Sequence, residues 1–151
     1  MSHTGSRPLN YEALADFRYA IRRYLNFSES NARKAGLEPQ QYQALLAIKG
    51  LEDWQSATIG VLAERLQIQH HSAVELMDRL EKRGMIRRHR SRNDRRKVLV
   101  ELTKRGEAKL KRISTPHRDE LQSAGRRLLW ALERFISHDG ERPHPKRRAR
   151  K

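Results

Sequence analysis

Arginine is the residue type whose number and spacing in this sequence point most directly to chemistry. Guanidinium groups hold phosphate oxygens through paired hydrogen bonds, and they enter narrow, electronegative DNA grooves more readily than lysine does. One acid, Asp94, lies among the arginines, where it either orients a neighbouring guanidinium or caps a turn. The cluster spans eleven residues and consists of Arg87, Arg88, Arg90, Arg92, Arg95, Arg96 and Lys97.

A second group of polar side chains has the chemistry to read bases. Gln pairs with adenine, Ser bonds bases or phosphates, and Glu accepts from cytosine, so these types at the start of one helix can discriminate sequence. Arg79 lies further along and is expected to contact phosphate. The candidate base readers are Gln69, His70, His71, Ser72 and Glu75.

The overall charge favours a polyanionic partner. The 151 residues include 33 Lys or Arg and 18 Asp or Glu, which gives a formal net charge of +15. Residues 82–112 alone hold 14 basic and 3 acidic residues, a net charge of +11. Such a block attracts phosphates and releases their counterions. A disordered charged segment is the alternative, and the regular apolar spacing within the block argues against it.

Residue types also exclude several mechanisms. The chain has no Cys, which excludes disulfides, thiolate metal sites and cysteine nucleophiles. His71 and Glu75 have the i, i+4 spacing of two metal ligands, but no HExxH pattern or Asp/His cluster accompanies them. We therefore expect a protein without catalytic residues, metal or cofactor, and not an enzyme. No membrane-spanning stretch or secretory leader is evident, so a cytoplasmic location is expected.

Periodic apolar residues predict the helices that position these groups. Asn10 and Thr58 are of the types that cap helix N-termini, and Pro39 suits a first helical position. Glycines at 36, 50 and 84 are expected to end helices. Three residues separate the short helix after Thr58 from the next one, which predicts a helix-turn-helix. The expected inward-facing residues of the second to fourth helices are Tyr42, Leu45 and Leu46; Ile59, Leu62, Ala63 and Leu66; and Ala73, Leu76, Met77 and Leu80.

The apolar period changes to two after Ile86, which predicts a β-hairpin. Its inner face is expected to carry Val98, Val100 and Leu102, and its turn to lie at residues 92–96.

The C-terminal part of the chain is expected to be helical. Thr103 has the type of a helix cap, and we expect Pro116 to begin a fresh helix capped by Thr115. This last helix and the first helix of the chain carry long apolar stripes, which can pack on each other or on a second subunit. Gly125, in the last helix, either allows close packing or is a neutral surface residue.

At this level of detail the sequence resembles the MarR-type winged-helix transcription regulators, from about Tyr11 to Ile136. The most specific part is LAERLQIQHHSAVELMDRLEKRGMIRR followed by NDRRKVLVELTKRG. Asp94-x-Arg96 and Leu102-Thr103-x-x-Gly106 fall where the family has them. The resemblance implies a mostly α fold with a small β-hairpin, in which a winged helix-turn-helix domain is flanked by N- and C-terminal dimerisation helices.

The resemblance also implies how the domain is organised. A single domain is expected over residues 9–137, with the DNA-binding lobe at about 37–103 and dimerisation helices at 9–36 and 104–137. Residues 138–151 are expected to be a disordered basic tail. Such a protein binds pseudo-palindromic double-stranded DNA as a homodimer and is typically a repressor. The DNA-binding wing implied here consists of Arg88, Arg90, Arg92, Asn93, Asp94, Arg95, Arg96 and Lys97.

A small aromatic or anionic effector is a further implication of the resemblance, placed between the dimerisation helices and the DNA-binding lobe. Its binding residues and its identity remain unassigned. Aromatic residues at helical spacing either line such a site or belong to the core or an interface. They are Tyr19, Tyr24, Phe27, Tyr42 and Trp54.

Some positions depart from the family pattern. Glu38 stands where Ser or Thr commonly precedes Pro39, so this helix start is expected to be weakly capped. Gln69, His70 and His71 are unusual at reading positions, so no operator sequence is implied. The alternative from another class is a basic RNA-associated or nucleoid-type structural protein, which the charge supports equally well.

Overall fold

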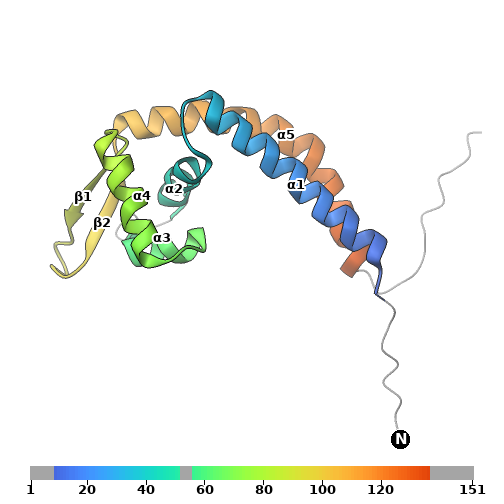
Figure 1. Cartoon of the computed structure of the whole chain (residues 1–151), viewed down its shortest axis with the longest axis horizontal. Helices are drawn as coiled ribbons and strands as arrows, with labels where there is room; N and C mark the ends of the chain where they lie inside the picture. Colours follow the sequence, from blue (N-terminus) through green and yellow to red (C-terminus); the bar gives the residue numbers. More distant parts are fainter. Residues whose placement is uncertain (1–8, 52–55, 137–151) are drawn as a thin grey trace, which may run out of the picture.

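The computed structural model describes residues 9–51 and 56–136, and Figure 1 shows them as a lobe from which a helical arm extends. The expected mostly α fold with one antiparallel two-stranded hairpin is confirmed. The lobe contains α2, α3, α4, the hairpin and the first half of α5, whereas the arm consists of α1 and the second half of α5. The elements are α1 (Tyr11–Lys34), α2 (Pro39–Lys49), α3 (Ile59–Leu66), α4 (His70–Lys82), β1 (Ile86–Arg90), β2 (Val98–Leu102) and α5 (Lys104–Ile136).

One apolar core holds the lobe together. Leu62 of α3 and Met77 of α4 are fully buried, and α2 and α5 contribute Leu45 and Ile113 to the same cluster. Burying a side chain of this size contributes about 1.5 to 3 kcal/mol. The inward-facing stripe predicted for α4 is buried throughout, which orients the opposite face of that helix towards solvent.

Side-chain caps begin the helices where the sequence predicts them. The Asn10 side chain accepts from the Ala13 N–H (3.0 Å), and the Thr58 hydroxyl accepts from the Val61 N–H (3.3 Å). A backbone N–H group at the start of α2 has a side-chain acceptor that the sequence did not predict. The buried Gln41 amide oxygen accepts from the Glu38 N–H (3.2 Å).

Two glycines end helices in the same left-handed conformation. Gly36 follows α1 with φ of 76°, and Gly84 follows α4 with φ of 67°. In each case the next residue donates its N–H back to the last turn: Leu37 to the Ala32 carbonyl (3.0 Å) and Met85 to the Leu80 carbonyl (3.0 Å). This glycine-dependent bond pattern turns the chain sharply out of the helix.

The predicted inward faces are wrong at two places. Leu46 of α2 is 46% exposed, and in the hairpin Val98 is exposed whereas Leu99 is only 3% exposed. The strand β2 has a neighbour on its second edge, because the Val100 N–H donates to the Ala57 carbonyl (2.8 Å). Leu99 lines the outer face of the hairpin together with His89 and Arg92, and the successive residues Leu99 and Val100 are both buried. Burial on both faces is not described by a period of two.

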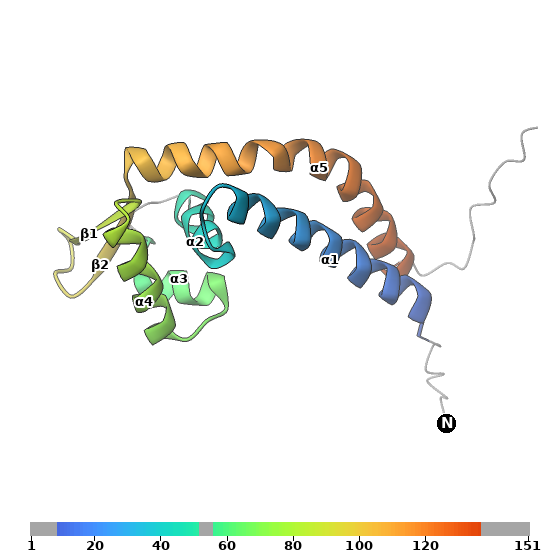
Figure 2. The ribbon, with the colours of Figure 1, turned by 45° about the horizontal axis from the view of Figure 1, so that its top comes forward.

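The prediction of a fresh helix at Pro116 is also wrong, because α5 runs unbroken through this residue. Pro116 has no N–H for the carbonyl of Arg112, and the Thr115 hydroxyl donates to the Lys111 carbonyl (2.8 Å) instead of capping a new helix. His117 is buried beside the proline and donates from Nδ1 to the Ile113 carbonyl (2.9 Å). Packing around His117 therefore keeps α5 continuous where proline removes a backbone hydrogen bond. The helix is bent along its length (Figure 2).

The base of the hairpin is joined to α5 by close backbone contacts. The Thr103 N–H donates to the Met85 carbonyl (3.0 Å), and the Thr103 hydroxyl donates to the Gly84 carbonyl (2.7 Å). The same hydroxyl accepts from the Gly106 N–H (3.1 Å), as predicted for a helix cap. A Cβ atom at Gly106 would collide with the Met85 carbonyl oxygen, so only glycine fits there.

We therefore predict that Gly106→Ala lowers the free energy of unfolding by about 1 to 3 kcal/mol, the usual cost of overpacking a core. Gly125→Ala is the matched control on the same helix, since nothing lies within 4 Å of a Cβ there. It should be neutral or stabilise the protein by up to about 1 kcal/mol. Urea denaturation of both variants measures the difference. Equal stabilities would refute the steric argument.

Candidate nucleic-acid interface

The turn between α3 and α4 presents the start of α4 to solvent. Gln67 adopts a left-handed conformation (φ 54°), and its side-chain Nε2 donates to the Glu64 carbonyl (2.7 Å). Gln69 then forms the N-cap of α4 in an extended conformation, without a side-chain cap hydrogen bond. The first N–H groups of a helix have no partner within it, and together with the macrodipole they favour anions. The start of α4 is therefore suited to a phosphate.

The predicted base readers lie on the solvent face of α4. Gln69, His70, His71 and Glu75 are exposed, and Ser72 is half-buried. Arg79, the predicted phosphate contact, is exposed as well. The structure thus brings all six residues to one end or one face of a single helix. Whether they contact DNA remains a prediction.

Arg88 joins the hairpin to α4. Its Nη2 lies 2.6 Å from Glu81 Oε2 and 2.7 Å from Asp78 Oδ1, and its Nε donates to Glu81 Oε2 (2.9 Å). The Arg88 backbone N–H donates to the other oxygen of Glu81 (3.0 Å). Side-chain hydrogen bonds from Arg88 lower the pKa of Glu81 and raise that of the guanidinium itself. The sequence predicts Arg88 as a DNA contact, and in the structure two carboxylates of α4 hold its partly exposed guanidinium.

The wing loop at residues 91–97 is shaped by its own polar side chains. The Ser91 hydroxyl accepts from the N–H groups of Asn93 (3.3 Å) and Asp94 (3.4 Å). Asp94 Oδ1 accepts from the Arg96 N–H (3.1 Å), so its carboxylate caps the turn, one of the two roles left open by the sequence. The loop closes through the Lys97 N–H, which donates to the Asp94 carbonyl (2.9 Å).

This loop geometry leaves the wing cations accessible. Arg92, Arg95, Arg96 and Lys97 are exposed, and Arg90 is exposed with its Nη1 donating to the Arg95 carbonyl (3.4 Å).

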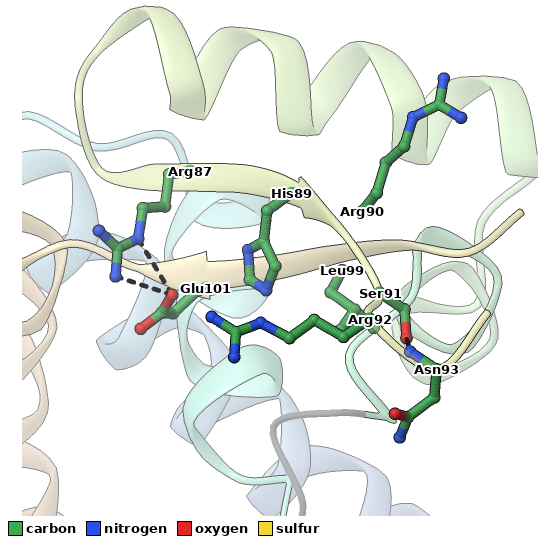
Figure 3. Close-up of a pocket in the computed structure, with 8 residues that line it drawn as sticks. All are labelled: Arg87, His89, Arg90, Ser91, Arg92, Asn93, Leu99 and Glu101. Carbon is green, nitrogen blue, oxygen red and sulfur yellow. Dashed lines mark hydrogen bonds and ion pairs between the residues drawn. The ribbon is translucent and has the colours of Figure 1, made fainter. Parts of the chain in front are cut away.

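The outer face of the hairpin brings Arg87, His89 and Glu101, which are not among the predicted wing residues, next to Arg92 of the wing. Figure 3 shows Arg87 paired with Glu101, and Arg92 reaching beneath His89, whereas Arg90 points away towards the helix above. The Arg87 Nε and Nη2 atoms both lie 3.0 Å from Glu101 Oε2. These side chains surround an open hollow of about 680 Å³. Strand alternation is the signal that separates Arg87 and His89 from Arg88, because successive residues point to opposite faces.

The wing and the base readers point the same way. In Figures 1 and 2 the tip of the hairpin and the N-terminal end of α4 both extend to the side of the lobe away from α5. The register of the hairpin pairs Ile86 with Leu102 at its base and Arg90 with Val98 near the tip. Together with the Arg88 ion pairs, this register fixes the wing beside α4.

The aromatic residues considered for an effector site are mostly packed around one histidine. The rings of Tyr24, Phe27 and Tyr42 lie 5.3 to 6.0 Å from the ring of His117. Tyr19 is 63% exposed on α1, and Trp54 lies outside the described residues. This group fits the core alternative, because the imidazole fills the space between the rings.

Two other kinds of site are not found in the part of the chain that the structure describes. Among them, no group of three or more His, Asp or Glu side chains is placed to hold a metal ion. None of the helices in residues 9–51 and 56–136 is long and apolar enough to cross a membrane.

Comparison with known proteins finds a family model that matches the lobe. Residues 35–97, which include α2, α3, α4 and the wing loop, match the family model described as MarR family. Over these residues the chain is similar to the MarR family. No curated protein matches it.

Solved structures extend the likeness beyond the matched residues. CouR, a transcriptional repressor bound to a 23-mer DNA duplex, is 28% identical, with a TM-score of 0.60 over 79% of this chain and 87% of that one. AbsC, a MarR family transcriptional regulator from Streptomyces coelicolor, is 19% identical, with a TM-score of 0.68 over 85% and 92%. A mutant of MarR from E. coli complexed with operator DNA is 19% identical, with a TM-score of 0.58 over 80% and 90%. The arm as well as the lobe therefore follows the fold of these regulators.

The Arg88 ion pairs predict a pH-dependent contribution to stability. The pKa of Glu81 is lower in the folded chain than its ordinary 4.5, so its stabilising effect is present above pH 4.5 and is lost as the pH falls below it. Glu81→Gln should therefore lower the free energy of unfolding at pH 7, by less than about 1 kcal/mol for a pair this exposed. The gap between the variant and the wild type should close as the pH falls from 4.5.

Urea denaturation at pH 7, 5, 4 and 3 measures this gap. Glu64→Gln, which removes an exposed carboxylate from the same lobe, is the control. A gap of equal size at pH 7 and pH 3 would contradict the ion-pair mechanism.

Proposed function

We propose that this protein is a sequence-specific, double-stranded DNA-binding transcriptional regulator that acts by binding and not by catalysis. One observation carries the proposal: an exposed polar face at the start of α4 and an arginine-bearing wing extend from the same side of one lobe. A helix and a hairpin in this arrangement suit a major groove and the neighbouring minor groove of one duplex.

The proposed roles follow from the side chains. Gln69, His70, His71, Ser72 and Glu75 face the base edges in the major groove, because α4 buries its other face in the lobe. The exposed Arg79 binds phosphate and fixes the register of the helix on the duplex.

In the wing, the cations of the loop reach the minor groove. Arg92, Arg95 and Arg96 are exposed on a loop that Ser91 and Asp94 hold in shape, so they meet the groove with little loss of conformational freedom. Asn93, Lys97 and Arg90 contribute alongside them. We assign Arg88 to positioning the wing, because two carboxylates of α4 hold its guanidinium.

A homodimer is the proposed assembly. The arm exposes several large apolar side chains, a feature that marks an interface where such side chains adjoin. Two identical arms pack in a self-complementary way about a twofold axis, which presents two reading helices to an inverted repeat. In this proposal residues 37–103 bind DNA, whereas residues 9–36 and 104–137 support the dimer. The exposed apolar residues of the arm include Tyr11 (73%), Tyr19 (63%), Leu129 (57%) and Trp130 (49%).

Known relatives support the finer parts of the proposal. CouR is a transcriptional repressor bound to DNA, and a MarR protein of Staphylococcus aureus, 20% identical, is in complex with salicylate and kanamycin. We propose by analogy that this chain is a repressor whose DNA affinity responds to a small aromatic or anionic ligand.

Selection of bound sequences from random duplexes tests the proposal. The full-length protein is expected to enrich an inverted repeat whose half-sites lie about one helical turn apart. Binding to the selected duplex should exceed binding to an RNA of equal length at fixed salt. Equal retention of all duplexes, or a preference for RNA, would favour a structural nucleic-acid coat and refute the regulator.

The wing makes a separate prediction. Arg96→Ala should weaken binding to the selected duplex and reduce the slope of log affinity against log salt by about 1 for each phosphate that Arg96 neutralises. Fluorescence anisotropy at several salt concentrations measures both effects. Arg23→Ala, which removes an exposed arginine from the arm, is the control and should leave affinity and slope unchanged. An Arg96→Ala protein that binds like the wild type would rule out a role of this arginine in the groove.

A further inference from the structure

A second basic surface lies on α5, outside the proposed operator site. Residues 104–118 hold six basic side chains and one acidic one, whereas residues 119–136 hold three of each. We call the exposed cations of this first half the α5 ridge. It consists of Lys104, Arg105, Lys111, Arg112 and Arg118, all of which are exposed.

Helix geometry puts the α5 ridge on one face. Lys104, Lys111 and Arg118 recur every seven residues, which is close to two turns, so they form a row about 21 Å long. The buried residues of the same stretch, Gly106 and Leu110 among them, lie about half a turn around the helix. The ridge therefore faces directly away from the core of the lobe.

Carboxylates do not neutralise this face. Glu107, the one acid of the stretch, is engaged by Lys49, whose Nζ lies 2.7 Å from its Oε1. Within residues 9–51 and 56–136, none of the five ridge cations forms an ion pair. Lys104 and Arg105 also occupy the first turn of α5, where the macrodipole favours acids. The helix itself gains no stability from this charge pattern.

The α5 ridge and the proposed operator site face opposite directions. In Figure 2 the first half of α5 runs along one side of the lobe, and α2 separates it from α3 and the N-terminal end of α4 on the other side. A duplex lying against α4 and the wing tip would have the thickness of the lobe between it and the ridge. The ridge is thus available to a second polyanion while the first site is occupied.

We propose that the α5 ridge binds the phosphate backbone of a second DNA duplex without regard to its sequence. This inference rests on the proposed function, because a dimer bound at its operator would then bridge two DNA segments. Duplex DNA is the occupant that fits best, because its phosphates form a continuous row of negative charge. The proposed operator site of the same protein also binds DNA. A ridge of Lys and Arg without Gln, Asn or Ser contacts phosphates and carries no base readout.

A two-step capture experiment tests the proposal with the full-length protein. The inverted-repeat duplex recovered by selection is immobilised and loaded with protein, and a fluorescent duplex of unrelated sequence is then added. Wild type is expected to be retained in the first step and to capture the fluorescent duplex in the second, less so as salt rises. Lys111→Glu/Arg112→Glu should load like the wild type and capture roughly tenfold less, or lower still.

The matched control makes the same charge change elsewhere. Lys146→Glu/Arg147→Glu reverses two cations of the C-terminal segment, which lies outside the described residues, and should load and capture like the wild type. Failure of the wild type to load would refute the proposed function, whereas loading without capture would overturn only the bridging proposal. The bridging proposal would also be overturned if the ridge variant captured the second duplex as well as the wild type does. The same holds if the folded ridge variant failed to load on the first duplex. Capture of polyglutamate but not of duplex would show a protein-docking surface instead.

Discussion

The contact between Thr103, Met85 and Gly106 determines how the working parts of this protein are placed. Gly84 ends α4, Met85 leads into β1, and Thr103 passes from β2 into α5, so three elements leave the same point. The Thr103 hydroxyl bonds to the Gly84 carbonyl on one side and to the Gly106 N–H on the other. Glycine at position 106 lets α5 approach the Met85 carbonyl closely. A rotation of the hairpin relative to the lobe would therefore also displace the start of α5. The relation between the reading face, the wing and the arm follows from this junction.

The same residue type serves unrelated purposes in this chain, so counting arginines overstates the free positive charge. Arg83 donates to the Gln41 side chain and to the Gly36 carbonyl (2.7 Å each), which fastens the end of α4 to α2. Arg88 fastens the hairpin to α4, and Arg134 fastens α5 to α1 by lying 3.1 Å from Asp16. These guanidinium groups replace water with fixed carboxylate and carbonyl oxygens. The accessible cations include those of the wing loop and those along the first half of α5.

Much of the fold could be predicted because its local signals agree with its tertiary packing. Thr58, Gln69 and Gly84 mark the bounds of the helix-turn-helix, and burial of one stripe of α4 leaves the predicted readers on the opposite face. The errors arise where distant segments decide the outcome. Leu99 is buried on the outer face of the hairpin among residues of β1 and the wing loop, and α5 continues through Pro116, where His117 is buried.

The candidate site shows the same division between local and distant effects. Exposure of the wing loop follows from its own sequence, since the turn-forming Ser91 and Asp94 are local. The internal role of Arg88 depends on Glu81, seven residues earlier on another element, and on Asp78 one turn before it. A strand register and a helix face must both be known before such a pair can be inferred. The charge pattern of a sequence therefore predicts where a basic surface lies more reliably than it predicts what each arginine contacts.

The continuity of α5 has a mechanical consequence for the proposed dimer. Its 33 residues form a helix about 50 Å long that carries both the arm and one wall of the lobe. At the bend, the His117 imidazole stacks on Tyr42 of α2 and lies 3.0 Å from the Ser28 hydroxyl of α1, so three helices meet there. With no loop to absorb a rotation of the arm, the rotation passes along α5 to Gly106 and the hairpin. In a twofold dimer, the packing of the arms therefore sets the spacing of the two reading helices. A ligand that changes the packing around His117 would change that spacing without contacting the DNA-binding face.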